Sequence, residues 1–155
     1  MNDNAIATIH FDGACEPVNP GGVATGGWIV RDCGQMLLAQ SRMFKRGEGA
    51  TNNYAEWCAL GCGLRALLTH RDMILANHLY IYGDSMLVIN QLNRKWKCNK
   101  EHLRKLRDRC EELLKDIGMM WTAEWIPREC NSEADELSRE AYEETTGRKF
   151  PERAR

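Results

Sequence analysis

The chain has 155 residues, 43% hydrophobic and 28% charged, a composition typical of one folded domain and unlike that of disordered or fibrous proteins. A formal net charge of −1 argues against binding of nucleic acid through total charge alone, and no apolar run approaches the roughly 18 residues of a membrane-spanning helix. The first four residues lack the pattern of an export signal, and seven cysteines without a Cys-x-x-Cys pair predict a reducing, cytoplasmic protein.

Strands are predicted for three segments near the N-terminus. Residues 6–11 form a β-prone run that ends in an Asp-Gly pair, and residues 28–31 and 36–44 flank a short turn signal. The stretch 17–27 is rich in glycine and proline, which predicts a loop. We therefore expect one strand, a long loop and an antiparallel hairpin.

Helical patterns dominate the middle of the chain. A helix is expected over residues 53–70, which begin with a capping asparagine, and a strand over 79–82 follows it. A second helix is expected from 85 to about 95. The clearest pattern covers 99–117, where apolar residues recur at alternating spacings of three and four and Gly118 can end the helix.

The C-terminal part adds a fifth strand and a last helix. The strand is expected over 119–126, the helix over 132 to about 145, and a loose basic tail over 148–155. The order of elements predicts a single α/β domain over residues 1–147. It would hold a mixed five-stranded sheet, with an antiparallel meander followed by two strands added after crossover helices that cover its faces.

Charges are separated along the chain despite the neutral total. Residues 94–109 contain eight Lys or Arg and two acids, whereas residues 128–144 contain seven acids and two Arg. This separation predicts one face that attracts phosphate and another that attracts cations. Two solvated helix surfaces would give the same counts, so the counts alone do not decide.

Four carboxylates fall at the ends of predicted elements: Asp12, Glu56, Asp84 and Asp135. Each has a structural explanation, because Asp12 precedes a turn glycine and Glu56 completes something close to a capping box. Asp84 could cap the helix that follows it, and Asp135 could face the positive end of the last helix dipole. Their positions alone favour these structural roles over catalysis.

The segments around the four acids resemble, in order, the four signature segments of the type 1 ribonuclease H family. These segments are Asp12-Gly13-Ala14-Cys15 with Asn19-Pro20-Gly21-Gly22, Thr51-Asn52-Asn53-Tyr54-Ala55-Glu56, Tyr82-Gly83-Asp84-Ser85, and Asn131-Ser132-Glu133-Ala134-Asp135-Glu136-Leu137-Ser138. The resemblance covers residues 6–142. It implies a ribonuclease H-like fold in which the fourth and fifth strands are added parallel to the first, so that the two aspartates that follow the first and fourth strands would lie side by side.

The resemblance also implies an activity, the hydrolysis of the RNA strand of RNA/DNA hybrids to 5′-phosphate and 3′-hydroxyl ends. Asp12 would bridge two Mg²⁺ ions, Glu56 and Asp84 would complete the site of one, and Asp135 would help to hold the other; Mn²⁺ could substitute. Clustered carboxylates repel one another unless divalent cations neutralise them, and Mg²⁺ prefers oxygen ligands. Two such ions, about 4 Å apart, can activate water and stabilise a leaving oxygen.

Substrate contacts follow from the same resemblance. The implied substrate-binding residues are Gly13, Cys15, Asn19, Thr51, Asn52, Ser85 and Trp96, of which Ser85 and Trp96 have the weaker support. Asn19, Asn52 and the backbone around Cys15 would contact RNA, and Thr51 would meet a phosphate of the DNA strand. Selection of RNA requires contact with the 2′-hydroxyl, which Glu56 would also touch. A simple turn at Asn19 and a half-buried core position for Trp96 are the structural alternatives.

The sequence departs from the longer family members in three places. Residues 96–99 run almost directly into the next helix, so the extra helix and basic protrusion of those members are missing, and the basic stretch 94–109 could partly replace them. No histidine follows His102, which leaves Arg128 nearest to the place of a loop histidine. An arginine does not transfer protons at ordinary pH, so its role would be electrostatic. Gly49 and Ala50 stand where longer relatives often have Arg and Thr at the DNA-phosphate pocket.

Three alternatives remain beside the hybrid-specific endonuclease, for which we expect a monomer without an obligate protein partner. The first is a catalytically weak protein on the same fold that only holds a hybrid or double-stranded nucleic acid. The second is an enzyme with another substrate, such as double-stranded RNA, or a DNA-strand-transfer enzyme. The third is a structural α/β domain in which the acids are caps.

Overall fold

The computed structural model describes residues 5–152. The expectation about an export signal at residues 1–4 and the last three residues of the basic tail lie outside this part. The described chain forms a five-stranded mixed sheet with the strand order β3-β2-β1-β4-β5. The strands are β1 Ile6–Glu16, β2 Val23–Asp32, β3 Gln35–Arg46, β4 His78–Gly83 and β5 Met120–Trp125.

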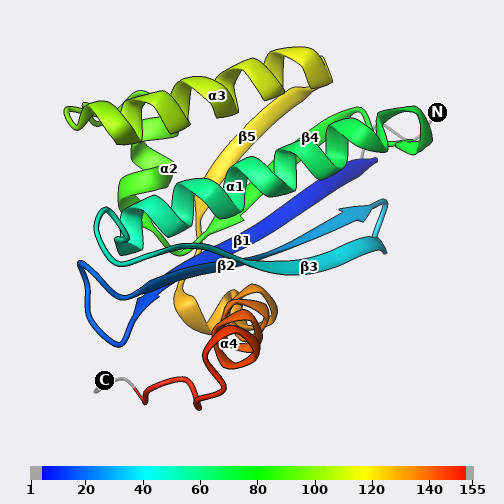
Figure 1. Cartoon of the computed structure of the whole chain (residues 1–155). Coiled ribbons are helices and arrows are strands. Elements are labelled where there is room, and N and C mark those ends of the chain that lie inside the picture. Colours follow the sequence, from blue (N-terminus) through cyan, green and yellow to red (C-terminus); the bar gives the residue numbers. More distant parts are fainter. Residues whose placement is uncertain (1–4, 153–155) are drawn as a thin grey trace.

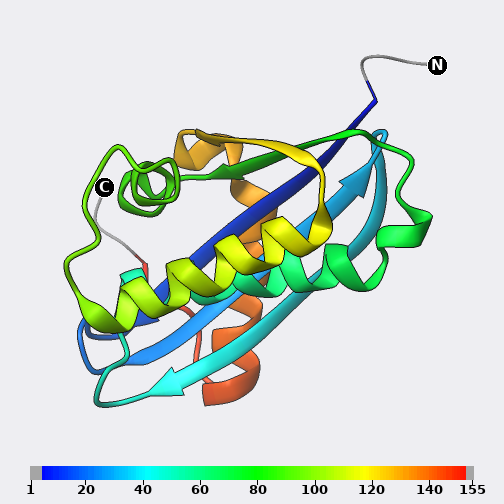
Figure 2. The ribbon, with the colours of Figure 1, turned by 90° about the horizontal axis from the view of Figure 1, so that it is seen from above.

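The first three strands form an antiparallel meander, and β4 and β5 are added parallel to β1. The helices are α1 Asn52–Thr69, α2 Met86–Leu92, α3 Glu101–Ile117 and α4 Ser132–Thr146, with short 3₁₀ turns η1 Arg71–Met73 and η2 Arg128–Cys130. Figure 1 shows α1 and α3 on one face of the sheet and α4 on the other. Figure 2, seen from above, shows α1 and α3 running beside each other along the sheet. The predicted fold class is confirmed.

The core lies between α1 and the sheet. Trp57, Leu60 and Leu64 of α1 are fully buried against Ile9 and Phe11 of β1. A side chain of this kind stabilises the fold by about 1.5–3 kcal/mol when it is buried. This layer fixes the position of α1 against β1. It therefore also fixes the side chains at the start of α1, which lie near the end of the sheet.

The predicted loop 17–27 is wrong for its last five residues, since β2 begins at Val23. Two glycines made this segment resemble a loop, but they serve close packing inside the sheet. A methyl group on Gly26 would lie 2.6 Å from the ring of Phe44, and one on Gly27 would lie 2.5 Å from Cβ of Leu137. The glycines therefore let side chains and α4 approach the sheet more closely than any other residue would allow.

The helices also differ from the prediction at their ends. The helix expected from 85 to about 95 ends at Leu92, and Arg94 adopts a left-handed backbone with φ of 61°. The helix expected over 99–117 begins at Glu101 and ends at Ile117, and Gly118 after it has φ of 69°, as predicted for a glycine cap.

The tail was predicted to be loose, but Phe150 is buried against α4. Its ring meets Tyr142 edge-on at 5.4 Å, and the guanidinium of Arg139 lies 4.7 Å from the ring centroid. Its backbone N–H donates a hydrogen bond to Glu143 Oε2 at 3.0 Å. The chain therefore stays packed on α4 at least as far as Phe150.

None of the helices within residues 5–152 is long and apolar enough to cross a bilayer.

The close contact between α4 and β2 gives a prediction for stability. Gly27→Ala is expected to lower the free energy of unfolding by about 1–3 kcal/mol, because the new methyl group would overlap Leu137. Gly61→Ala is the matched control, since its methyl group would lie 3.8 Å from Cys110 Sγ, an ordinary contact. Within α1 it should leave stability unchanged or raise it by up to about 1 kcal/mol. Urea denaturation of both variants measures the difference, and equal stability of the two would contradict the packing described.

Candidate active site

The candidate site forms where three elements of the fold meet. Phe11 of β1 pairs with Gly83 of β4 in parallel register, so the next residues, Asp12 and Asp84, lie side by side. A methyl group on Gly13 would lie 2.4 Å from the backbone nitrogen of Glu56. Only glycine at this position lets α1 come close enough to β1 to bring Glu56 to the two aspartates.

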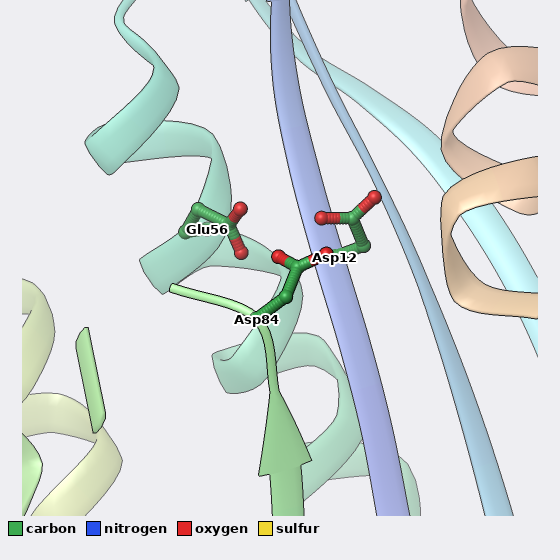
Figure 3. A group of neighbouring side chains, drawn as sticks. All are labelled: Asp12, Glu56 and Asp84. Carbon is green, nitrogen blue, oxygen red and sulfur yellow. The ribbon is translucent and has the colours of Figure 1, made fainter. Parts of the chain in front are cut away.

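The three carboxylates form a compact cluster. One oxygen from each of Asp12, Glu56 and Asp84 lies within 4.8 Å of the others. Figure 3 shows the three side chains pointing toward one another from β1, from α1 and from the end of β4. Asp12 and Glu56 are buried, with exposed fractions of 6% and 3%, and Asp84 is partly buried.

None of these three acids has the structural role that its position in the sequence suggested. Asp12 lies within strand β1 and forms no turn. Thr51, and not Asn53, caps α1, so Glu56 takes no part in a capping box. Ser85 caps α2 by accepting from the Val88 N–H at 3.2 Å, a role first considered for Asp84. The cluster therefore needs another explanation than helix capping.

Burial and mutual repulsion make the ionised cluster costly. Burial, together with the charges of Asp84 and Asp135, raises the pKa of Asp12 well above its usual range. Burial and then the neighbouring Asp12 and Asp84 do the same to the pKa of Glu56. Burial also raises the pKa of Asp84, although Arg128 acts in the opposite direction. A divalent cation would remove this cost by neutralising the charges.

The ligand chemistry of the cluster fits such an ion. Glu56 Oε2 is buried and has no hydrogen-bond partner among residues 5–152, so it is an acceptor still to be satisfied. All the grouped ligand atoms are carboxylate oxygens, which Mg²⁺ and similar hard cations prefer. The residues present therefore fit a hard divalent cation held by Asp12, Glu56 and Asp84.

Asp135, the fourth predicted ligand, lies next to this cluster but outside it. Its charge and a hydrogen bond contribute to the raised pKa of Asp12, so the two side chains are neighbours. Its Oδ2 accepts a hydrogen bond from Arg139 Nε at 2.9 Å, one turn further along α4. Asp135 thus faces the cluster while it forms an ion pair with its own helix.

Asn131, which the sequence identified only as part of a motif, links three parts of the site. It precedes α4 but forms no side-chain cap; its Nδ2 instead donates to the Phe11 carbonyl at 2.8 Å. A hydrogen bond from Asn131 also lowers the pKa of Asp84. Trp125 is a second residue that the sequence analysis missed, and its Nε1 donates to the Asp84 carbonyl at 3.1 Å. An asparagine directly before a predicted helix is the sequence signal that could have identified the first.

Most of the predicted substrate residues join one loop to the start of α1. Asn19 Oδ1 accepts from the Asn52 N–H at 3.0 Å, and Thr51 Oγ1 accepts from the Tyr54 N–H at 3.0 Å. The Cys15 thiol donates to the Ala50 carbonyl at 3.4 Å. These bonds hold the loop beside the carboxylates, so part of each residue's role is structural.

Trp96 and Arg128 both lie between Asp84 and Asp135 in the sequence and are both exposed. Trp96 is 48% exposed, which argues against the core position considered for it, and it lines a cavity of about 470 Å³ with four basic residues. These basic residues are Arg94, Lys95, Lys97 and Arg107. Arg128 is exposed on η2 and close enough to Asp84 to lower its pKa.

Comparisons with known proteins agree with this geometry. A family model described as "Reverse transcriptase-like" matches residues 10–141. The chain is 35% identical over 135 residues to the "Ribonuclease HI" of Halobacterium salinarum; the match covers 87% of this chain and 63% of that protein. The chain thus spans less than two thirds of the length of this curated relative.

Solved structures show the same fold. The crystal structure of RNase H1 from Halobacterium salinarum is 34% identical, with a TM-score of 0.78, and the match covers 90% of this chain and 98% of that one. LC11-RNase H1, solved in complex with an RNA/DNA hybrid, is 27% identical with a TM-score of 0.79 and the same coverage. Both likenesses extend over nearly the whole of the solved chains.

The raised pKa values predict how stability depends on pH in the metal-free protein. A carboxyl whose pKa is higher in the folded state contributes most stability below its unfolded pKa, and that stability is lost as the pH rises through the folded pKa. Asp12→Asn should therefore be more stable than the native chain in EDTA at about pH 8, by about 1–2 kcal/mol. At about pH 4 the two should be similar, because the native carboxyl is then largely protonated in the folded protein.

Chemical denaturation in EDTA at both pH values measures this effect. Excess Mg²⁺ should stabilise the native chain and leave Asp12→Asn almost unchanged, because binding to the folded state alone stabilises it. A variant less stable than the native chain at the higher pH would show that the cluster is not repulsive.

Proposed function

The chain belongs to the type 1 ribonuclease H family, and we propose that it is an endoribonuclease that hydrolyses the RNA strand of RNA/DNA hybrids. The observation that carries the proposal is the cluster of Asp12, Glu56 and Asp84, buried at the junction of β1, β4 and α1. Support comes also from a similar protein, LC11-RNase H1, which was solved with an RNA/DNA hybrid.

We propose that the site holds two Mg²⁺ ions, for which Mn²⁺ could substitute. Asp12, Glu56 and Asp84 would hold one, and Asp12 with Asp135 would hold the other. Such a pair of ions supplies an activated water and stabilises the leaving oxygen, which gives 5′-phosphate and 3′-hydroxyl ends. Because Arg139 pairs with Oδ2 of Asp135, the second ion would bind Oδ1 or share Oδ2 with the arginine.

The remaining residues position the carboxylates and the substrate. Asn131 would keep Asp84 fixed relative to β1 through its bond to the Phe11 carbonyl. Arg128 is an exposed positive charge near Asp84, where it would attract the phosphate to be cut. Asn52, at the first turn of α1, would contact the RNA strand. The residues of a single chain suffice for this proposed site, and we propose that the protein acts as a monomer.

Cleavage of strand-labelled substrates tests the proposed function. With Mg²⁺ or Mn²⁺ the protein should cut the RNA strand of an RNA/DNA hybrid, and it should leave the DNA strand and matched duplex RNA intact. Asp84→Asn should lower the rate by about 100-fold or more, because it removes a charged ligand. A phosphate-dependent 5′-exonuclease should digest the RNA products.

Each outcome separates one alternative. Cutting of duplex RNA at a similar rate would favour the broader substrate range, and binding without cutting would favour a protein that only holds the hybrid. Full activity in Asp84→Asn would show that the carboxylate cluster is not the active site.

Arg128→Ala is expected to slow turnover by about 10-fold without abolishing it, since the residue contributes charge and no ligand. Arg128→Lys, which keeps the positive charge, should recover much of the rate. The exposed Lys115→Ala on α3 controls for loss of one positive charge elsewhere. Steady-state cleavage at fixed ionic strength measures all three, and an Arg128→Ala variant with the kinetics of Lys115→Ala would place Arg128 outside the site.

A further inference from the structure

A groove follows the side of α1 away from the carboxylates. It consists of two neighbouring cavities of about 260 and 300 Å³, both lined by Arg42 of β3 and by Cys62 and Arg65 of α1. Arg109 of α3 lines the first. Figure 1 shows α1 lying between β3 and α3, the elements that supply the walls. We call this feature the cationic groove.

The charges of the cationic groove are of one sign. Neither cavity has an aspartate or a glutamate among its lining residues. Arg42 and Arg65 are exposed and form no ion pair within residues 5–152, whereas Arg109 is paired with Glu112 at 3.1 Å. By contrast, the cavity between α4 and the sheet is lined by three glutamates, Glu133, Glu136 and Glu140. In a chain of net charge −1, this concentration of unpaired arginine fits an anionic ligand.

The positive charges of the groove act to lower the pKa values of two cysteine thiols that line it. Burial raises the pKa of Cys58 to about 11, and Arg42 and Lys45 act against that rise. Burial likewise raises the pKa of Cys62, against which Arg42 and Arg65 act. The cations are thus close to the floor of the groove.

The groove begins beside the proposed substrate site. Lys45 lies over the ring of Tyr54, with its Nζ 5.5 Å from the centroid, and a methyl group on Gly49 would lie 2.9 Å from the same nitrogen. Tyr54 donates its N–H to Thr51, one of the proposed substrate residues. From Tyr54 to Arg65 the helix rises about 16 Å, which corresponds to about 3–5 nucleotides of a single strand.

The walls combine these cations with aromatic rings. Tyr54 and Phe44, both partly exposed, line the first cavity and are the rings that a base could reach. Trp28 at the second cavity is 5% exposed and supports Phe44 from below, with a ring-centroid distance of 6.3 Å. A positive groove with aromatic walls is typical of proteins that bind single-stranded nucleic acid, where cations meet phosphates and rings meet bases. Cavities of this volume admit a nucleotide or a small ligand but exclude a duplex.

We propose that the cationic groove binds a single-stranded continuation of the nucleic-acid substrate as it leaves the hybrid, with Arg42 and Arg65 contacting its phosphates. This proposal rests on the proposed function, because it takes the carboxylate cluster as the place where the duplex binds. The protein would then hold a hybrid that ends in a single strand more tightly than a blunt one.

Binding measured in EDTA, which prevents cutting, tests the proposal. The native chain is compared on a blunt hybrid and on hybrids with overhangs of about 5 nucleotides, placed on the DNA or the RNA strand and at either end. One of the overhangs should tighten binding by about 10-fold. The strand that carries this overhang, RNA or DNA, is then the one that enters the cationic groove. Arg42→Ala/Arg65→Ala should abolish that gain, reduce the slope of log affinity against log salt by about 2, and leave blunt-hybrid binding unchanged.

Two controls make the result specific. Arg42→Lys/Arg65→Lys should keep most of the gain, and Lys115→Ala, which removes an exposed charge that lines neither cavity, should keep all of it. Thermal unfolding confirms that the variants are folded. Equal affinity for blunt and overhanging hybrids, or an equal loss on both in the double alanine variant, would overturn the proposal. The cleavage assay decides the proposed function separately, since a native chain that cuts no hybrid could still show the overhang effect.

Discussion

The repulsion among three buried carboxylates is the constraint on which the rest of this structure depends. Like charges within 4.8 Å of one another in a protein interior are unfavourable, so the fold must hold Asp12, Glu56 and Asp84 together against their own charge. It does so with its most rigid parts. The parallel pairing of β1 with β4 fixes the two aspartates, and the core layer under α1 fixes the glutamate. Stability of the core thus supports a site that, without a cation, weakens the fold.

The sequence predicted much of this arrangement because the information is local. The order of strands and helices along the chain followed from where short apolar runs and helical patterns alternate. The parallel placement of β1 beside β4 was implied by the resemblance to the family, and the four acids stood out through the motifs around them. The sequence failed where a residue's role depends on distant neighbours. Gly26 and Gly27 resembled a loop because nothing nearby in the sequence reveals that Phe44 and Leu137 press against them. Phe150 resembled part of a loose tail because the basic residues around it do not reveal that its ring packs against Tyr142 of α4.

The same limit explains the errors at the site itself. Capping positions can be recognised from residue type but not from which oxygen is turned inward, so Asn53 was expected to cap α1 where Thr51 does. Asn131 is a residue type that often caps a helix, but its side-chain amide donates to the Phe11 carbonyl instead. The first outcome is a choice between neighbouring local caps, whereas the second depends on a partner 120 residues away that only the folded chain brings together. The catalytic and binding roles of the four carboxylates, Arg128 and the substrate residues stay predictions.

Arg139 connects the acidic side of the site to the C-terminal segment. It donates to Asp135 and also lies over the ring of Phe150, so its guanidinium is held from two sides. An arginine held this way loses little further entropy in pairing with a carboxylate, which strengthens the pair. An ion that recruits Oδ2 of Asp135 would compete with an interaction that the packing of Phe150 reinforces. An ion that binds Oδ1 would instead meet a carboxylate already held in place by Arg139, so the docking of this segment on α4 would orient the proposed ligand.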